Sequence, residues 1–145
     1  MIKNKLFLLL NYRLRRLSYI EKSVSYNSSC EIISSELHGK VILAESVKLY
    51  GVKTCGKIII GRYTSCWGPN INILSELNSI EIGNFCSIAS DVTIQESYHN
   101  HQFLTTYHIG KNVLGLKNDK TDFVSKGPIK IGHDVWIGKG AKIMS

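Results

Sequence analysis

The chain has 145 residues, of which 43% are hydrophobic and 20% are charged, so its composition is that of a globular domain rather than of a disordered segment. The formal net charge of +7 owes most to the start of the chain, where five basic residues precede the first acidic one. Because these basic residues form one end, and not a face with interleaved aromatic residues, the sequence argues against a nucleic-acid partner.

The first 36 residues are expected to form a basic amphipathic helix followed by a linker. Between residues 2 and 20, apolar side chains recur in steps of three and four, as on one face of a helix. Such a helix either packs on the main domain or a neighbouring subunit, or lays its basic side on anionic lipid at the inner membrane. Residues 23–36 are rich in Ser, Asn and Glu, which is typical of a linker.

The four cysteines contain no Cys-x-x-Cys pair, which argues against a zinc site of paired thiolates and against a disulfide framework. Reduced cysteines indicate a cytoplasmic protein. The apolar run at residues 6–10 is far shorter than the roughly 20 residues that a transmembrane helix needs. We therefore expect a cytoplasmic protein, with at most peripheral membrane contact through its first segment.

From about residue 37 the sequence follows a period of six residues. Two series of isoleucines show this spacing: Ile82, Ile88 and Ile94, then Ile131, Ile137 and Ile143. Six-residue repeats are typical of a parallel β-helix, in which short strands and sharp turns close a three-sided coil and the aliphatic residues stack along its axis. Glycines such as Gly83, and polar residues such as Asp91, are expected to adopt the unusual backbone angles of the corners.

The six-residue period breaks between Ile94 and Ile131. Residues 97–127 are therefore expected to leave the coil as a long loop, and long loops in compact domains tend to be functional or disordered. The loop contains His99, His101 and His108. A neutral imidazole can accept a proton from a hydroxyl group near neutral pH, so this loop is where we expect catalysis.

Three segments carry a resemblance to a known family: residues 82–94, residues 99–107 with their Thr-Thr-Tyr motif, and residues 131–138. They resemble the hexapeptide-repeat xenobiotic acetyltransferases and the related enzymes that O-acetylate surface polysaccharides. The resemblance implies an all-β, left-handed parallel β-helix over residues 37–145 that forms a homotrimer with active sites between subunits. It implies acetyl-CoA as co-substrate and no metal, and it implies that further C-terminal coils are missing after Ser145.

The resemblance also assigns the catalytic residue. The family's general base lies eight residues before the tyrosine of the Thr-Thr-Tyr motif, which selects His99, with His101 as second choice. Tyr107 itself is expected to line the acceptor site, or else to pack within the loop. Glu96, three residues before the histidine, is positioned in the sequence to orient it.

Three more residues are expected at the binding site. Trp136 should point outward, because Ile137 takes the inward position, and should form a wall of the acceptor or CoA groove or pack under the loop. Gly138 and Ala141, by the same resemblance, should present their backbone to the pantetheine arm of CoA. The alternative for both is that a small residue is needed at a corner.

The expected function is transfer of an acetyl group from acetyl-CoA to a hydroxyl of a surface-polysaccharide or glycan precursor. One alternative is a chloramphenicol or streptogramin O-acetyltransferase with the same chemistry, and another is a truncated, non-catalytic β-helix protein. A β-helix zinc hydratase would need three histidine ligands around one metal. No second histidine lies five residues from His133, which argues against that reading.

Overall fold

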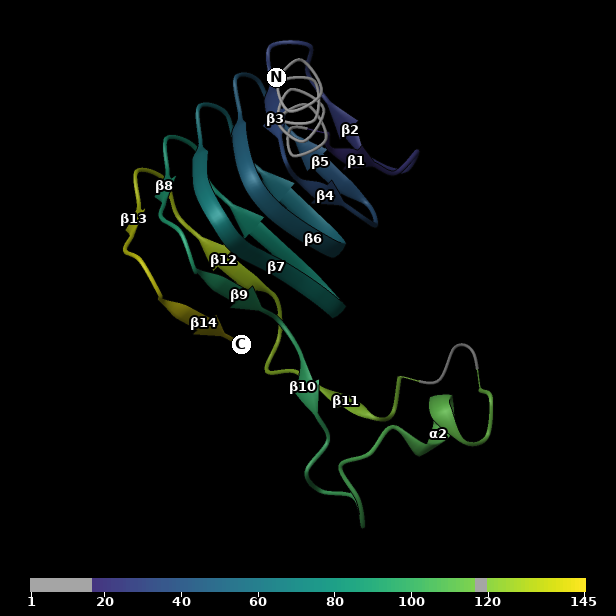
Figure 1. Ribbon diagram of the computed structural model, residues 1–145. Coiled ribbons are helices and arrows are strands. Elements are labelled where there is room, and N and C mark those ends of the chain that lie inside the picture. Colours follow the sequence, from purple (N-terminus) through teal and green to yellow (C-terminus); the bar gives the residue numbers. More distant parts are fainter. Residues whose placement is uncertain (1–16, 117–119) are drawn as a thin grey trace, which may run out of the picture.

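The computed structural model describes residues 17–116 and 120–145. The described chain winds into stacked coils whose strands pair in parallel, which confirms the predicted parallel β-helix (Figure 1). The helix expected over residues 2–20 lies mostly outside the described residues. Its last part is not helical, because Tyr19–Ile20 form strand β1. No helix in the described part of the chain is long and apolar enough to cross a bilayer.

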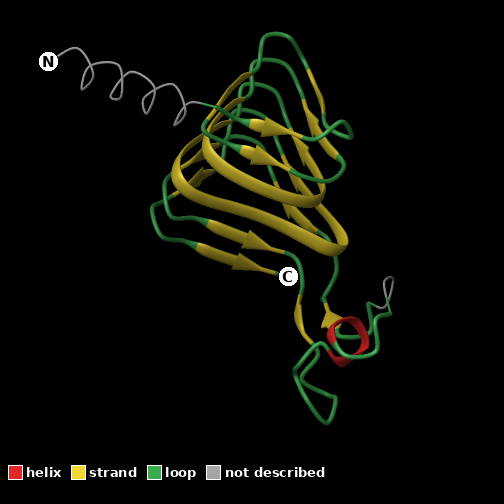
Figure 2. Ribbon diagram, turned by 45° about the vertical axis from the view of Figure 1, so that its right-hand side comes forward, coloured by secondary structure: helices red, strands yellow, loops and turns green. Residues whose placement is uncertain are grey.

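Each coil has three sides, and the strands on a side are stacked as parallel neighbours (Figure 2). The first side contains β2 (Ser25–Tyr26), β5 (Val41–Leu43), the ends of β6 (Lys48–Ile60) and β7 (Ser65–Ile82), and β12 (Ile129–Ile131). The second side contains β3 (Glu31–Ile33), the starts of β6 and β7, β8 (Ser87–Ile88) and β13 (Trp136–Ile137). The third side contains β1, β4 (Glu36–Leu37), the middles of β6 and β7, β9 (Thr93–Gln95) and β14 (Lys142–Met144).

The two isoleucine series stack on each other across adjacent coils, as predicted. The register pairs Ile82 with Ile131, Ile88 with Ile137 and Ile94 with Ile143. In the coil that contains Ile82, Ile88 and Ile94, these side chains are almost fully buried, with 1% of Ile88 and 0% of Ile94 exposed. Burial of one such side chain stabilises the fold by roughly 1.5–3 kcal/mol, so these inward isoleucines contribute substantially to stability.

Residues 23–36, expected to be a linker, instead complete the first coil of the β-helix. They form β2, β3 and the start of β4, and Val24, Cys30 and Ile32 pack against the core. The linker prediction is therefore wrong, and the β-helix begins well before residue 37. Ser and Asn fill the outward positions of this coil, which hid the spacing of its few inward apolar residues.

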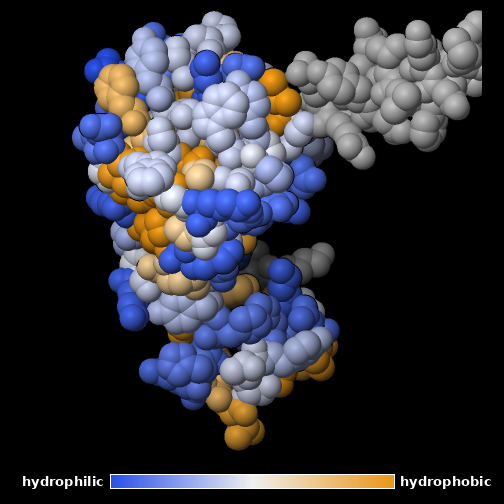
Figure 3. Space-filling view, turned by 60° about the vertical axis from the view of Figure 1, so that its left-hand side comes forward, coloured by the Kyte–Doolittle hydropathy of each residue, from blue (hydrophilic) through white to orange (hydrophobic). Residues whose placement is uncertain are grey.

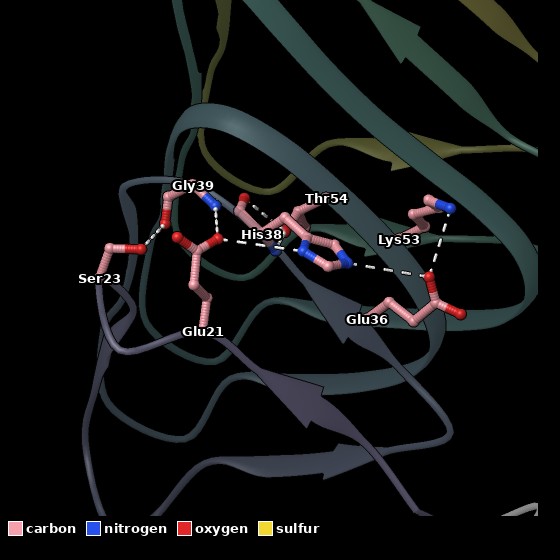
Figure 4. A network of polar contacts seen from close by, with 7 residues as sticks. All are labelled: Glu21, Ser23, Glu36, His38, Gly39, Lys53 and Thr54. Atoms are coloured by element: carbon pink, nitrogen blue, oxygen red, sulfur yellow. Dashed lines mark hydrogen bonds and ion pairs between the residues drawn. The ribbon is translucent and has the colours of Figure 1, made fainter.

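Polar side chains connect the first coils to one another (Figure 4). The Glu21 carboxylate accepts a hydrogen bond of 2.8 Å from the Gly39 backbone and lies 3.9 Å from Nδ1 of His38. Glu36 lies 3.9 Å from Nε2 of the same imidazole and 3.3 Å from Nζ of Lys53. Because the residues come from successive coils, the network ties these coils together, although each exposed pair contributes at most about 1 kcal/mol.

The glycine that follows an isoleucine of the repeat, as at Gly83, serves close backbone approach rather than an unusual backbone angle. A Cβ atom on Gly83 would overlap the carbonyl group of Gly132 in the next coil. The positive φ angles of the corners occur at non-glycine residues such as Phe85 (59°) and Asp91 (60°), and at other glycines such as Gly51 (61°). The expected backbone role is thus confirmed for Asp91 and wrong for Gly83.

The long loop leaves the third side after β9 and returns at β12, as predicted (Figure 1). Within it, β10 (Tyr98–His99) pairs in antiparallel fashion with β11 (Phe123–Val124), and the short helix α2 spans Ile109–Asn112. We call residues 97–127 the excursion. The β10–β11 pair forms its base and holds His99 next to the third side.

Candidate active site

His99 is fixed by the backbone of its own excursion. Its Nδ1 atom lies 2.7 Å from the carbonyl oxygen of Thr106. A carbonyl oxygen can only accept a hydrogen bond, so Nδ1 carries the proton in the neutral ring. Nε2 is then left with its lone pair. An imidazole in this tautomer can act as a general base through Nε2.

Two further rings hold the imidazole in place. His108 stacks on His99 with ring centroids 4.3 Å apart and an interplanar angle of 24°. Phe123, the register partner of His99, packs on the other histidine at 4.5 Å and 54°. The Nε2 atom of His108 is buried and has no hydrogen-bond partner among the described residues. This stack and the hydrogen bond to Thr106 together fix the orientation of the His99 ring.

A hollow of about 220 Å³ lies beside His99. Its lining comes from the third side of the coils and from the base of the excursion: Cys55, Leu74, Ser75, Glu76, Gln95, Ser97, Tyr98, His99 and Phe123. Small-molecule sites commonly enclose about 300–1,000 Å³. The hollow is therefore smaller than a typical small-molecule site.

Glu96 does not orient His99, contrary to our expectation. Its side chain is fully buried and accepts hydrogen bonds from the backbone N–H groups of Glu76 and Leu77 (3.1 and 3.0 Å) and from the Asn78 amide (2.8 Å). Burial raises the pKa of this carboxyl, but the hydrogen bonds outweigh it and bring the pKa down to about 2. Glu96 is thus an ionised anchor for the bend of β7.

The other predicted site residues do not line this hollow. Tyr107 lies in the excursion and is 57% exposed, and Trp136 points outward from β13, as predicted, with 80% of its surface exposed. The backbone of Gly138 has open space beside it, whereas Ala141 packs against the core. In Figure 1, β13 lies at the left of the last coil, whereas β10 lies outside the coils, below them. Within one chain, Trp136 and Gly138 are therefore apart from His99.

Sequence reasoning missed the residues that hold the His99 ring. Thr106 was noticed only as part of the tyrosine motif, and His108 only as a loop histidine. The contribution of Phe123 depends on the pairing of β10 with β11, which joins residues 24 positions apart (His99 and Phe123). A hint was available in the aromatic residues Tyr98 and Phe123, which lie near the two ends of the excursion.

The described residues contain no group of three or more His, Cys, Asp or Glu side chains that could hold a metal ion. All four cysteines are free, and Cys66 and Cys86 are buried. Comparison with protein-family models gives no match, and comparison with curated proteins gives none either. The fold and the site therefore define the chain as a parallel β-helix protein with a histidine-bearing excursion.

Proposed function

We propose that the protein is a CoA-dependent O-acetyltransferase that transfers an acetyl group from acetyl-CoA to a hydroxyl of a surface-polysaccharide or glycan precursor. The proposal depends on one observation. His99 donates its Nδ1 proton to Thr106 over 2.7 Å, and the lone pair of Nε2 remains free in an exposed position beside a hollow. This is the arrangement that a general base for an alcohol requires.

In the proposed reaction, Nε2 of His99 removes the proton from the acceptor hydroxyl as the oxygen attacks the thioester carbonyl. The C–S bond of the tetrahedral intermediate then breaks, and the thiolate of CoA takes the proton back from the imidazolium. The products are the O-acetyl ester and free CoA. No covalent enzyme intermediate is needed, because the thioester is already reactive. Hydrogen-bond donors aimed at the developing oxyanion would supply the remaining stabilisation.

A homotrimer would complete the site, because Trp136, Gly138 and Ala141 of one subunit could then meet His99 of another. The excursion has the surface for such contact: Leu104 is fully exposed, and Val113 and Leu114 are 66% and 64% exposed. In Figure 3, hydrophobic side chains are exposed at the tip and edge of the end that the excursion forms, among hydrophilic ones. Exposed apolar patches of this kind mark interaction sites. We propose that a second copy of the chain covers the exposed apolar side chains of the excursion.

The basic first segment favours a glycan acceptor, because lipid-linked glycans are assembled at the inner face of the membrane. We therefore place the protein in the cytoplasm, with peripheral membrane contact. The competing acceptors are chloramphenicol and streptogramins, on which the same base would act. An acceptor screen separates the two classes of acceptor.

The experiment is such a screen with the purified chain and acetyl-CoA, in which free CoA is measured. Release of CoA with glycan acceptors supports the proposal, and release only with an antibiotic reverses the choice of acceptor. Loss of transfer in His101→Ala, but not in His99→Ala, would move the base to the second histidine. If acetyl-CoA does not bind at millimolar concentration, the chain is a non-catalytic β-helix.

A further inference from the structure

We propose that the second side of the β-helix carries a glycan-binding hollow between Tyr63 and Trp67. It is separate from the hollow beside His99, which lies against the third side. This hollow binds pyranose rings whether or not the chain transfers acetyl groups.

The hollow has a volume of about 440 Å³ and is lined by five residues: Ser46, Lys48, Tyr63, Ser65 and Trp67. Lys48 and Ser65 are register partners at the starts of β6 and β7, so they form neighbouring rungs of its floor. Tyr63 and Trp67 precede and follow Ser65 by two residues and are 48% and 54% exposed. The volume falls in the range of about 300–1,000 Å³ that small-molecule sites occupy.

Both aromatic rings are held in place before any ligand arrives. Trp67 stacks on Tyr50 of the preceding coil, with centroids 4.3 Å apart and planes 14° apart. Tyr63 stacks on Phe85 of the following coil at 5.4 Å and 1°, and its hydroxyl donates a 3.1 Å hydrogen bond to Glu45. Rings that are already ordered lose little conformational entropy on binding, which favours affinity.

In the preceding coil, the position equivalent to Tyr63 is Ser46, which leaves one face of the tyrosine ring uncovered. Ser46 and Tyr63 are equivalent corner positions of successive coils, with φ angles of 55° and 58°. Since the serine side chain is short, the face of Tyr63 opposite Phe85 borders the hollow. A pyranose ring has an apolar C–H face and a rim of hydroxyls, and the C–H face packs against the electron-rich face of an aromatic ring.

The floor supplies groups for the hydroxyl rim of the sugar. Lys48 offers three N–H donors, and Ser46 and Ser65 offer hydroxyls that donate and accept. Within residues 17–116 and 120–145, Lys48 has neither an ion pair nor a side-chain hydrogen bond, so its ammonium group is available to a ligand. It can bind a sugar hydroxyl or the carboxylate of a uronic acid.

The lining favours a sugar over a second copy of this chain. Cores of protein–protein interfaces are depleted in Lys and Ser. Three of the five lining residues, Ser46, Lys48 and Ser65, belong to these two types. Aromatic walls around a polar floor are instead what a ligand with apolar faces and a polar rim requires.

The test is titration of the full chain with maltohexaose and with an oligogalacturonate of similar length, followed by calorimetry and tryptophan fluorescence. We expect binding to at least one probe, and a loss of affinity of at least about tenfold in Trp67→Ala and in Tyr63→Ala. Ser65→Gln, which keeps both rings but fills the floor, should weaken binding as well. Tyr26→Ala removes an aromatic residue that is 49% exposed on the first side and should bind like the wild type.

The His99→Ala variant distinguishes glycan binding in this hollow from acetyl transfer at the proposed active site. His99→Ala should keep its full glycan affinity even if transfer is lost. If neither probe binds at millimolar concentration, or if Trp67→Ala and Ser65→Gln both bind like the wild type, the inference is overturned. It is also overturned if Trp67→Ala dissociates an oligomer while its glycan affinity is unchanged, because the surface would then be a contact between subunits.

Discussion

The imidazole rings of His99 and His108 stack with their centroids 4.3 Å apart, and the second ring is packed in turn on Phe123. The three residues come from the outgoing strand, the middle and the returning strand of the excursion. The His99 ring is thus placed by contacts within the excursion, and not by a neighbouring carboxylate. His108 is therefore a positioning residue in the proposed site.

Substitution of His108 tests that role. His108→Ala removes the stack and should lower kcat by up to about tenfold, since an aromatic pair contributes about 0.5–1.5 kcal/mol. His108→Phe keeps a ring in the stack and should restore most of the activity, with KM for acetyl-CoA unchanged in both variants. Lys111→Ala, on α2, is the matched control. Equal loss in the Phe and Ala variants would mean that the imidazole acts through its nitrogens, and not through its ring.

The close approach of coils at Gly83 predicts a contrast between two glycines. Gly83→Ala places a methyl group onto the carbonyl of Gly132 and should destabilise the fold by about 1–3 kcal/mol, as overpacking does. Gly132→Ala meets nothing within 4 Å and should change the free energy of unfolding by at most about 0.5 kcal/mol. Thermal or urea unfolding of both variants measures the difference. Equal changes in unfolding free energy for the two variants would contradict the close approach of the coils at Gly83.

Glu96 predicts a specific loss of stability in acid. Hydrogen bonding holds the pKa of this buried carboxyl at about 2, below its ordinary value of about 4.3. Because the pKa is lowered in the folded state, the ionised Glu96 carboxylate stabilises the fold fully above about pH 4.3. This stabilisation is lost as the pH falls toward about 2. The lowering of the Glu96 pKa corresponds to a stabilisation of the folded state on the order of 3 kcal/mol.

Urea unfolding of Glu96→Gln and of the wild type between pH 7 and pH 2 measures this effect. The difference in unfolding free energy should be largest at neutral pH and should shrink steadily below about pH 4. Glu81→Gln, at a side chain that is 42% exposed, serves as the control and should show little difference at any pH. A difference for Glu96 that does not change with pH would contradict the assignment.

The cysteines should differ in reactivity. Burial, with a smaller contribution from Cys86, raises the pKa of the Cys66 thiol to about 12, so almost no thiolate forms near neutral pH. Cys55 is exposed at the edge of the hollow beside His99. Brief iodoacetamide treatment of the folded protein should modify Cys55 and leave Cys66 unmodified, as read by peptide mass spectrometry. Rapid labelling of Cys66 in the folded protein would show that the core is open.

The sequence was sufficient to predict the coil where the six-residue period is strict. Ile82, Ile88 and Ile94 predicted both the inward positions and the partners that stack on them. The period was not recognisable in the first coil, where Cys30 is among the few apolar residues, so these residues were taken for a linker. The outward direction of Trp136 followed from the inward position of Ile137 alone.

The site could be predicted only in part, because loop contacts are not periodic. The position of His99 on the excursion followed from the break in the repeat. The contact with Thr106 depends on how the excursion folds back on itself, and no local pattern encodes that. The direction of Glu96 was missed because sequence proximity to His99 seemed to favour contact, while three donors in β7 compete for the carboxylate.

The most direct measurement is the rate of CoA release by the wild type and by His99→Ala at saturating acetyl-CoA, with the best glycan acceptor from the screen. If Nε2 of His99 takes the acceptor proton, the variant should lose on the order of 100- to 10,000-fold in kcat. Its melting temperature and acetyl-CoA affinity should match those of the wild type. Equal rates in the two proteins would contradict the proposal that this histidine is the base.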